Sequence, residues 1–196
     1  MFSLNKGSQA KKDRHSRLLD KIKEDPFMTD EDIAEYLDVS IPTIRLDRLE
    51  LGIPELRQRI KDVASHNHKK VRALHAEEIV GEIVEIQLGQ SGISILDTTD
   101  QMVFEQSRIV RGHYIYSLAE SLAIAVIDAE VALVGVANIK YKTPVYSGSR
   151  LVAKADVRQN RQRQHIVWVL IYYKQKEVFR GKFILVSVGN NDMNGG

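Results

Sequence analysis

The sequence predicts an α+β protein in which a helical N-terminal part precedes an antiparallel sheet wrapped around a single helix. Two short helices separated by a three-residue turn are predicted between residues 30 and 51. Two strand-like apolar runs follow Gly81, and four more follow an apolar helix predicted over residues 111–127. Because two strands are followed by one helix and then by four strands, we expect a single sheet with one face buried against that helix.

Composition excludes several classes of protein. The 196 residues allow one large domain or two small ones, and without cysteine there is no disulfide, thiolate metal site or cysteine nucleophile. A net charge of +2 does not by itself predict a nucleic-acid partner. The longest apolar region, residues 121–139, is interrupted by Asp128 and Glu130, and no segment resembles a signal peptide. We therefore expect a cytoplasmic protein without a membrane partner.

The first elements are predicted from residues 1–24. Residues 1–12 are polar, which predicts a flexible arm. A helix is expected over residues 13–24, where Leu18, Leu19 and Ile22 form one apolar stripe. Pro26 ends this helix, because the residue before a proline disfavours helical backbone.

The next two helices form a predicted helix-turn-helix. Thr29 is expected to cap a helix over residues 30–37, and Ser40 is expected to cap a third helix with Pro42 in its first turn. The buried face of the third helix is predicted to contain Ile44, Leu46 or Leu49, and Leu51. Its exposed face is predicted to contain Thr43, Arg45, Asp47 and Arg48.

The chemistry of that exposed face favours DNA as the partner. Short polar and guanidinium side chains near the start of a recognition helix can bind base edges in the major groove. Residues 1–52 are therefore interpreted as a winged-helix or helix-turn-helix-like DNA-binding domain. A structural helical hairpin, or a helix pair that binds protein, is the alternative.

Residues 53–77 predict an amphipathic linker helix. Arg57, Arg59 and Lys61 would form a basic side that follows the DNA backbone, with binding that depends on salt. The alternative is an ordinary solvated helix face, which Glu55 and Asp62 support. The linker histidines lack further ligands at metal-binding spacing, so no metal site is expected.

The β-rich domain is predicted over residues 78–189 and is followed by a disordered tail over residues 190–196. Its four later strands are expected over residues 133–141, 151–157, 166–173 and 178–188, with turns between them. The strand aromatics Trp168, Tyr172 and Tyr173 are expected in the core or in an interface.

The turn that opens the apolar helix is the strongest candidate for a ligand site. Helix N-termini present unpaired N–H groups and the positive end of the helix dipole. Arg111 adds a guanidinium suited to bidentate carboxylate binding, Gly112 begins the helix, and Glu120 lies further along it. This arrangement indicates an anion or thioester site that senses a ligand for the DNA-binding module.

Several strings resemble one known family. Residues 40–51 read SIPTIRLDRLEL, and the other matching strings are residues 53–57, 59–61, 103–104, 111–113, 121–128 and 152–155. In order and over nearly the whole chain, they resemble the FapR family of bacterial repressors of fatty-acid and phospholipid synthesis genes. The resemblance implies a helix-turn-helix followed by a hot-dog domain. It also implies a homodimer on palindromic operator DNA that is released by malonyl-CoA or malonyl-acyl-carrier protein, with no cofactor.

The resemblance also assigns residues. Arg111 would pair with the malonyl carboxylate, Gly112 would place a backbone N–H near the thioester, and Phe104 would line the pocket. The ligand site is thus predicted at Phe104, Arg111, Gly112 and Glu120, and DNA binding at Ser40, Thr43, Arg45, Arg48, Arg57, Arg59 and Lys61.

Two residues depart from the family pattern, and one of them supports an enzyme alternative. The family usually has glutamine in place of Pro42 and asparagine in place of Glu120. An ionised glutamate accepts hydrogen bonds but donates none. Residues 111–113 and 118–120 also resemble the motif of hot-dog acyl-CoA thioesterases, in which a carboxylate is catalytic. Glu120 is then a weakened effector contact, a catalytic base, or a structural partner of Arg111. We favour a repressor without catalytic residues, because a plain thioesterase does not need the DNA-binding head.

Overall fold

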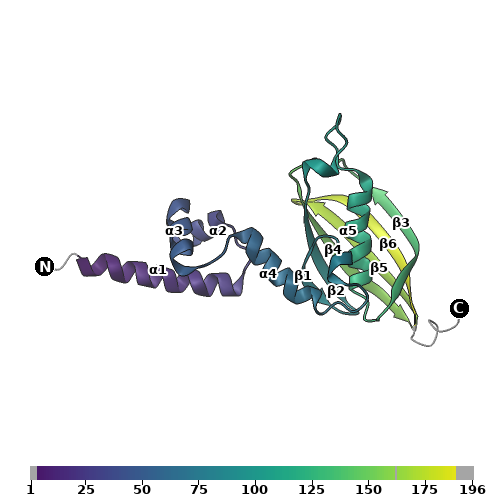
Figure 1. The fold of residues 1–196 in the computed structure, drawn as a ribbon, viewed down its shortest axis with the longest axis horizontal. Helices are drawn as coiled ribbons and strands as arrows, with labels where there is room; N and C mark the ends of the chain where they lie inside the picture. Colours follow the sequence, from purple (N-terminus) through teal and green to yellow (C-terminus); the bar gives the residue numbers. More distant parts are fainter. Residues whose placement is uncertain (1–3, 162, 189–196) are drawn as a thin grey trace. The chain divides into compact units, whose positions relative to one another are not determined.

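A computed structural model describes residues 4–161 and 163–188 of the chain (Figure 1). Two compact units are present, Met1–Asp62 and Val63–Gly196. Their boundary lies inside the helix Leu56–His68, which is shorter than the linker helix predicted over residues 53–77. The predicted tail of residues 190–196 lies outside the described residues. No helix in the described ranges is long and apolar enough to cross a membrane.

The first helix, α1 (Leu4–Glu24), is longer than expected. The flexible arm predicted over residues 1–12 is wrong from Leu4 onward, since those residues are helical. Lysine, glutamine and alanine are good helix formers, and the Gln9 amide donates to the Asp13 carboxylate across one turn at 3.0 Å. A polar composition fits an exposed helix as well as a disordered arm.

The helix-turn-helix is confirmed by its caps. In α2 (Asp30–Leu37), Thr29 and Asp32 form a reciprocal capping box. In α3 (Ile41–Leu51), the Ser40 hydroxyl accepts from the Thr43 N–H at 3.4 Å. Gly52 ends α3 in the left-handed conformation with φ +65°, which glycine adopts without strain.

The core of the first unit differs from the predicted one at α3. Leu18, Ile33 and Ile44 are fully buried, as expected for the inner faces of three packed helices. Leu46 and Leu49, however, are 61% and 78% exposed, and the predicted burial of either of them is wrong. No strand occurs among the described residues 4–62, so the unit has a helix-turn-helix but no wing.

The second unit confirms the α+β class. Within the described ranges one six-stranded antiparallel sheet has the order β1-β2-β4-β5-β6-β3 (Figure 1). Its strands are β1 (Glu82–Gln87), β2 (Ser91–Asp97), β3 (Ala132–Tyr141), β4 (Arg150–Arg161), β5 (Gln164–Tyr173) and β6 (Lys176–Ser187). The turn predicted over residues 158–164 is shorter than expected, because β4 continues to Arg161.

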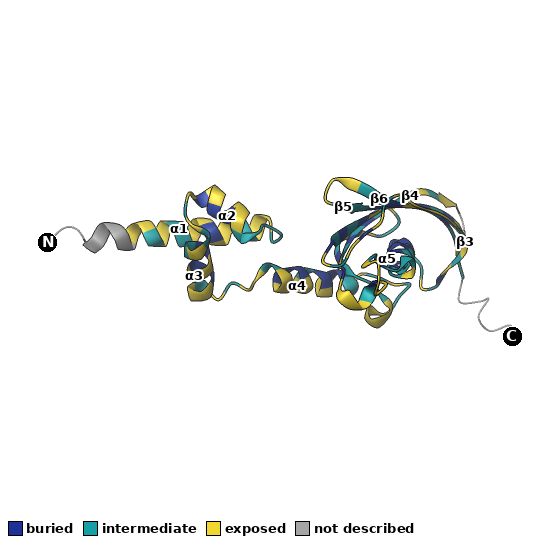
Figure 2. Cartoon of the chain, turned by 90° about the horizontal axis from the view of Figure 1, so that it is seen from above, coloured by how far each residue is buried: buried dark blue, intermediate teal, exposed yellow. Residues whose placement is uncertain are grey.

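The sheet curves around α5 (Gly112–Ala125), as Figure 2 shows by the buried faces turned towards that helix. This is the hot-dog architecture. Leu118, Leu122, Phe179 and Phe183 are almost completely buried in its core. A Cβ at Gly92 would lie 2.8 Å from Val126, so glycine is what lets α5 approach β2.

Three short helices complete the chain. The helix α4 (Leu56–His68) follows α3 and contributes residues to both units. The 3-10 helix η1 (Ala76–Glu78) precedes β1, and η2 (Asp100–Met102) follows β2. The position of η2 matters for function, because its last residues contact the turn that opens α5.

Candidate functional site

The exposed face of α3 is the candidate DNA-contacting surface. The Arg45 side chain is 65% exposed and Thr43 is partly exposed, as predicted. The hydroxyl of Ser40 is 2.8 Å from that of Thr43, so both lie at the start of the helix. Arg57 and Lys61 of α4 are also exposed. These five residues are accessible to a nucleic acid.

Arg48 is not on that face. Its side chain is 9% exposed, and its guanidinium donates to both carboxylate oxygens of Asp30 at 2.8 and 2.9 Å. The prediction that Arg48 faces the major groove is wrong, because this bidentate pair holds α3 against the start of α2. The Asp30 carboxylate also lies 3.6 Å from Arg45.

Arg59 is likewise structural and not a backbone contact. The residue is 5% exposed, and its guanidinium donates to the carbonyl oxygens of Pro26, Met28 and Pro54 at 3.0, 2.6 and 2.7 Å. Burial lowers the pKa of Arg59, and the charge of Arg48 adds to this shift. The predicted role of Arg59 on DNA is wrong, since its donors are committed to the turn before α2.

A second buried charge cluster joins α1 to α3. Asp47 is 2% exposed and accepts from the Arg14 guanidinium at 2.6 and 3.0 Å, while the His15 Nε2 lies 2.9 Å away. The prediction that Asp47 is exposed is wrong. Sequence reasoning missed the cluster, although a charged residue at a helix position that periodicity places near the core was a signal for it.

Stability of the first unit should depend on pH through Asp47. The Arg14 hydrogen bond lowers the pKa of the Asp47 carboxyl below its ordinary value, so its contribution is present above about pH 4 and is lost as pH falls through the folded-state pKa. Asp47→Asn should therefore reduce the free energy of unfolding by about 1–3 kcal/mol at neutral pH. Denaturant titrations between pH 7 and pH 2 should show this difference shrink as pH falls. A difference that does not change with pH would contradict the assignment.

In the second unit, the turn before α5 is tied to η2. Arg111 donates its backbone N–H to the Met102 carbonyl at 2.9 Å, and its guanidinium donates to the Gln101 carbonyl and the Tyr114 hydroxyl. The guanidinium also stacks on the Tyr114 ring at 5.1 Å. These contacts use part of its five donors and fix where the positive charge lies.

A cavity of about 330 Å³ lies beside this turn. Ile115, Tyr141 and Pro144 contribute to its walls, and Gly112 stands at its edge. The Tyr141 hydroxyl donates to the Gly112 carbonyl at 3.0 Å, so an aromatic side chain from β3 covers the first residue of α5. Phe104 is 56% exposed and is not among the residues that line this cavity, so its place in an effector pocket stays a prediction.

Glu120 lies two turns further along α5. It accepts from the Tyr116 hydroxyl at 3.0 Å, while the contacts of Arg111 are with η2 and Tyr114. Burial, together with this hydrogen bond, raises the pKa of Tyr116. The hypothesis that Glu120 is a structural partner of Arg111 is wrong. Eight residues of helix separate Gly112 from Glu120 by about 12 Å, so one small acyl group does not span both on one chain.

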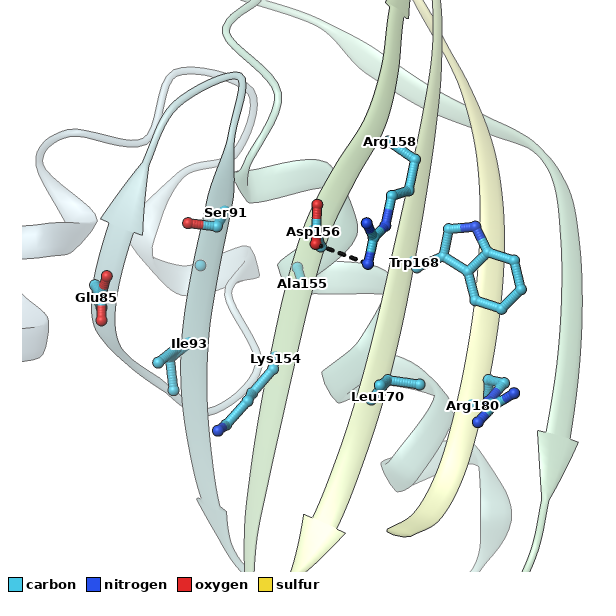
Figure 3. Close-up of a pocket in the computed structure, with 11 residues that line it drawn as sticks. Glu85, Ser91, Ile93, Lys154, Ala155, Asp156, Arg158, Trp168, Leu170 and Arg180 are labelled. Carbon is cyan, nitrogen blue, oxygen red and sulfur yellow. Dashed lines mark ion pairs between the residues drawn. The ribbon is translucent and has the colours of Figure 1, made fainter.

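A larger groove of about 500 Å³ lies on the sheet face that points away from α5 (Figure 3). Trp168 lines it, which places this aromatic outside the predicted core. Two of its three cations are paired with carboxylates, Arg158 with Asp156 at 3.0 Å and Arg180 with Glu177 at 2.9 Å, and Glu85 also lines the groove. The groove is therefore not strongly electropositive. No group of residues suited to hold a metal ion occurs in the part of the chain that the structure describes.

Comparison with known proteins shows the family of the chain. The chain is 57% identical over 179 residues to transcription factor FapR of Thermoanaerobacter sp. (strain X514), covering 91% of this chain and 90% of that protein. It is 47% identical over 175 residues to transcription factor FapR of Halalkalibacterium halodurans, covering 89% and 94%. A solved structure of an uncharacterized protein from Pyrococcus horikoshii is 26% identical with a TM-score of 0.57, covering 63% of this chain and 95% of that one. No family model matches the chain.

Proposed function

Because the chain belongs to the FapR family of transcription factors, we propose that it represses fatty-acid and phospholipid synthesis genes and is released from operator DNA by a malonyl thioester. The observation that carries the proposal is the pairing of a helix-turn-helix with a hot-dog unit in one chain. The first unit supplies an exposed recognition helix, and the second supplies a cation at a helix N-terminus. A DNA-binding head and an anion site together make a ligand-controlled regulator.

The DNA side is supported by accessible polar and basic residues. Thr43 and Arg45 lie on the open face of α3 and would contact base edges, where an arginine binds guanine through two hydrogen bonds. Arg57 and Lys61 would contact phosphates, because both are exposed on α4. Arg48 and Arg59 instead stabilise the unit that presents them.

The homodimer is supported by the open edge of the sheet. In the described ranges β3 is an end strand, and its exposed apolar residues are Leu133, Val136, Ile139 and Tyr141. A long edge strand with apolar side chains exposes unpaired backbone groups and tends to pair with another chain. Two heads carried by a two-fold symmetric dimer would bind a palindrome with fixed half-site spacing.

The effector side is supported by Arg111 and Gly112. The malonyl carboxylate distinguishes malonyl-CoA or malonyl-acyl-carrier protein from acetyl thioesters, and a guanidinium is the side chain best suited to bind it. The N–H groups of the first turn of α5 would polarise or hold the thioester carbonyl. Release requires that the ligand bind more tightly to the conformation of the protein that does not bind operator DNA.

One experiment tests the whole proposal. The purified chain is mixed with a promoter fragment of a fatty-acid synthesis operon and analysed by gel shift, with malonyl-CoA or acetyl-CoA added. Malonyl-CoA should release the DNA and acetyl-CoA at the same concentration should not. Failure to retain the promoter, or equal release by both thioesters, would contradict the proposal.

Arg45→Ala should weaken specific operator binding by roughly 1–3 kcal/mol, because a bidentate base contact is lost. Lys61→Ala is the matched control, since loss of a phosphate contact weakens all sequences alike and reduces the salt slope by about one. Fluorescence anisotropy on operator and random duplexes over a salt series separates the two effects. An equal loss of specific and random binding in Arg45→Ala would exclude a base contact.

The enzyme alternative rests on Glu120 and its hydrogen bond from Tyr116. If the chain only senses its ligand, Glu120→Gln should change malonyl-CoA affinity by less than about twofold, because a unit charge about 12 Å away in water contributes only about 0.3 kcal/mol. Neither protein should release CoA in a thiol-trapping assay. Turnover by the wild type that disappears in Glu120→Gln would instead establish a thioesterase.

A further inference from the structure

Among the residues of the first unit whose exposure the structure describes, the most exposed large apolar side chains lie on α3. Leu46 is 61% exposed and Leu49 is 78% exposed, whereas Ile44 on the opposite face is fully buried. Neither leucine belongs to the core cluster of this unit. Two leucines exposed on one short helix contribute little burial free energy to this unit, whereas a partner that covered them would gain that free energy.

Helical geometry places these leucines beside the residue expected to contact bases. Leu49 follows Arg45 by four residues and Leu46 by three, so the three side chains share one stripe of α3. The Arg45 side chain at 65% exposure extends from the same stripe. A partner that contacts Arg45 on this face would therefore also contact Leu46 and Leu49.

The charge around the stripe fits DNA better than an apolar protein surface. The acidic residue next to it, Glu50, is paired with Lys11 of α1 at 2.6 Å, which offsets its repulsion of phosphates. The guanidinium of Arg45 would have to be desolvated in an apolar protein interface. In the major groove it would instead meet base acceptors and the negative potential of the phosphates.

We propose that Leu46 and Leu49 are specificity-determining residues that contact thymine 5-methyl groups in the major groove of the operator. The thymine methyl is the one apolar group that a base presents there. Side chains three positions apart on a helix are about 5–6 Å apart at Cβ. They can therefore reach methyl groups one or two base pairs apart at about 3.4 Å per step. This inference rests on the proposed DNA-binding function and extends it to sequence preference for A·T pairs.

The test removes the methyl groups from the DNA. A binding site is first selected from a random duplex pool with the full-length chain. Each thymine in the site is then replaced singly by deoxyuridine, which keeps the base pair and lacks only the methyl group. At one or more thymines of each half-site, the dissociation constant should rise about fourfold, the equivalent of one buried methyl group.

Variants of the protein assign the effect to residues. Leu46→Ala and Leu49→Ala should weaken binding to the thymine duplex, and each should lose its sensitivity to uracil at its own position, which is the signature of a direct pair in a double-mutant cycle. Leu19→Ala is the matched control, a 37% exposed leucine on α1 that should leave the uracil sensitivity unchanged. Because Leu46 and Leu49 lie outside the core, both variants should keep the wild-type circular dichroism.

The outcomes separate this inference from the proposed function. Selection of a specific duplex that binds equally well with uracil at every thymine position overturns the methyl contact alone. Equal losses on thymine and uracil duplexes in both leucine variants also overturn it. Failure to select any duplex overturns the proposed function.

Discussion

Arg59→Ala should destabilise the first unit and thereby abolish operator binding, although Arg59 itself is buried in that unit. The substitution leaves the carbonyl oxygens of Pro26, Met28 and Pro54 without their buried donor. At about 1 kcal/mol or more for each lost partner, the expected loss is roughly 3 kcal/mol or more. For a unit of this size that is a large part of the total free energy of unfolding, which is of the order of 0.1 kcal/mol per residue.

Amide hydrogen exchange on the full chain measures this effect in each unit separately. In Arg59→Ala the amides of α1, α2 and α3 should lose protection, while those of the sheet should keep it. Arg57→Ala is the matched control, because that arginine is exposed on the same helix. It should leave exchange unchanged and weaken DNA binding by one phosphate contact. If Arg59→Ala keeps wild-type protection of its amides but loses DNA binding, Arg59 contacts DNA directly and the structural role is wrong.

Arg111→Ala should leave operator binding within about twofold of the wild type and remove the response to malonyl-CoA. A charge-assisted bidentate hydrogen bond contributes about 1.5–3 kcal/mol, so affinity for malonyl-CoA should fall by roughly ten- to a hundredfold. Acetyl-CoA lacks the carboxylate, so its weaker affinity should change little. Calorimetry with both thioesters measures the difference directly.

Arg111 also holds η2 through the Gln101 and Met102 carbonyls, so a structural effect must be separated from a lost ligand contact. Tyr114→Phe removes the hydroxyl that Arg111 contacts and leaves the cation in place. It should retain most of the malonyl-CoA response. Arg111→Lys keeps the charge but not the planar fork and should recover only part of the affinity. Unchanged malonyl-CoA affinity in Arg111→Ala would exclude its proposed role.

Local signals predicted most elements of the fold. The caps at Thr29 and Ser40 predicted α2 and α3, and the alternating apolar runs predicted all six strands around one apolar helix. These signals depend on contacts within a few residues, so the sequence contains them directly. The same reasoning failed at residues 4–12, where polarity indicates exposure but does not distinguish a solvated helix from an arm.

The faces of α3 could not be predicted in this way. Side-chain polarity assigned Leu46 or Leu49 to the interior and Asp47 and Arg48 to solvent, and the structure has the reverse. Leu51 packs against the core as expected. A buried charge is tolerable when a partner neutralises it, and the partners Arg14 and Asp30 are 33 and 18 residues away in the chain.

The candidate ligand site shows the same division. Sequence alone determined that a cation and a glycine open an apolar helix, that a carboxylate lies further along it, and that a DNA-binding head precedes them. Only the tertiary structure decided that Arg111 is fixed to η2, that Tyr141 covers Gly112, and that Glu120 is held by Tyr116. Helix formation depends on neighbours in sequence, whereas the state of a charged group depends on which distant donors and acceptors the fold brings within hydrogen-bonding distance.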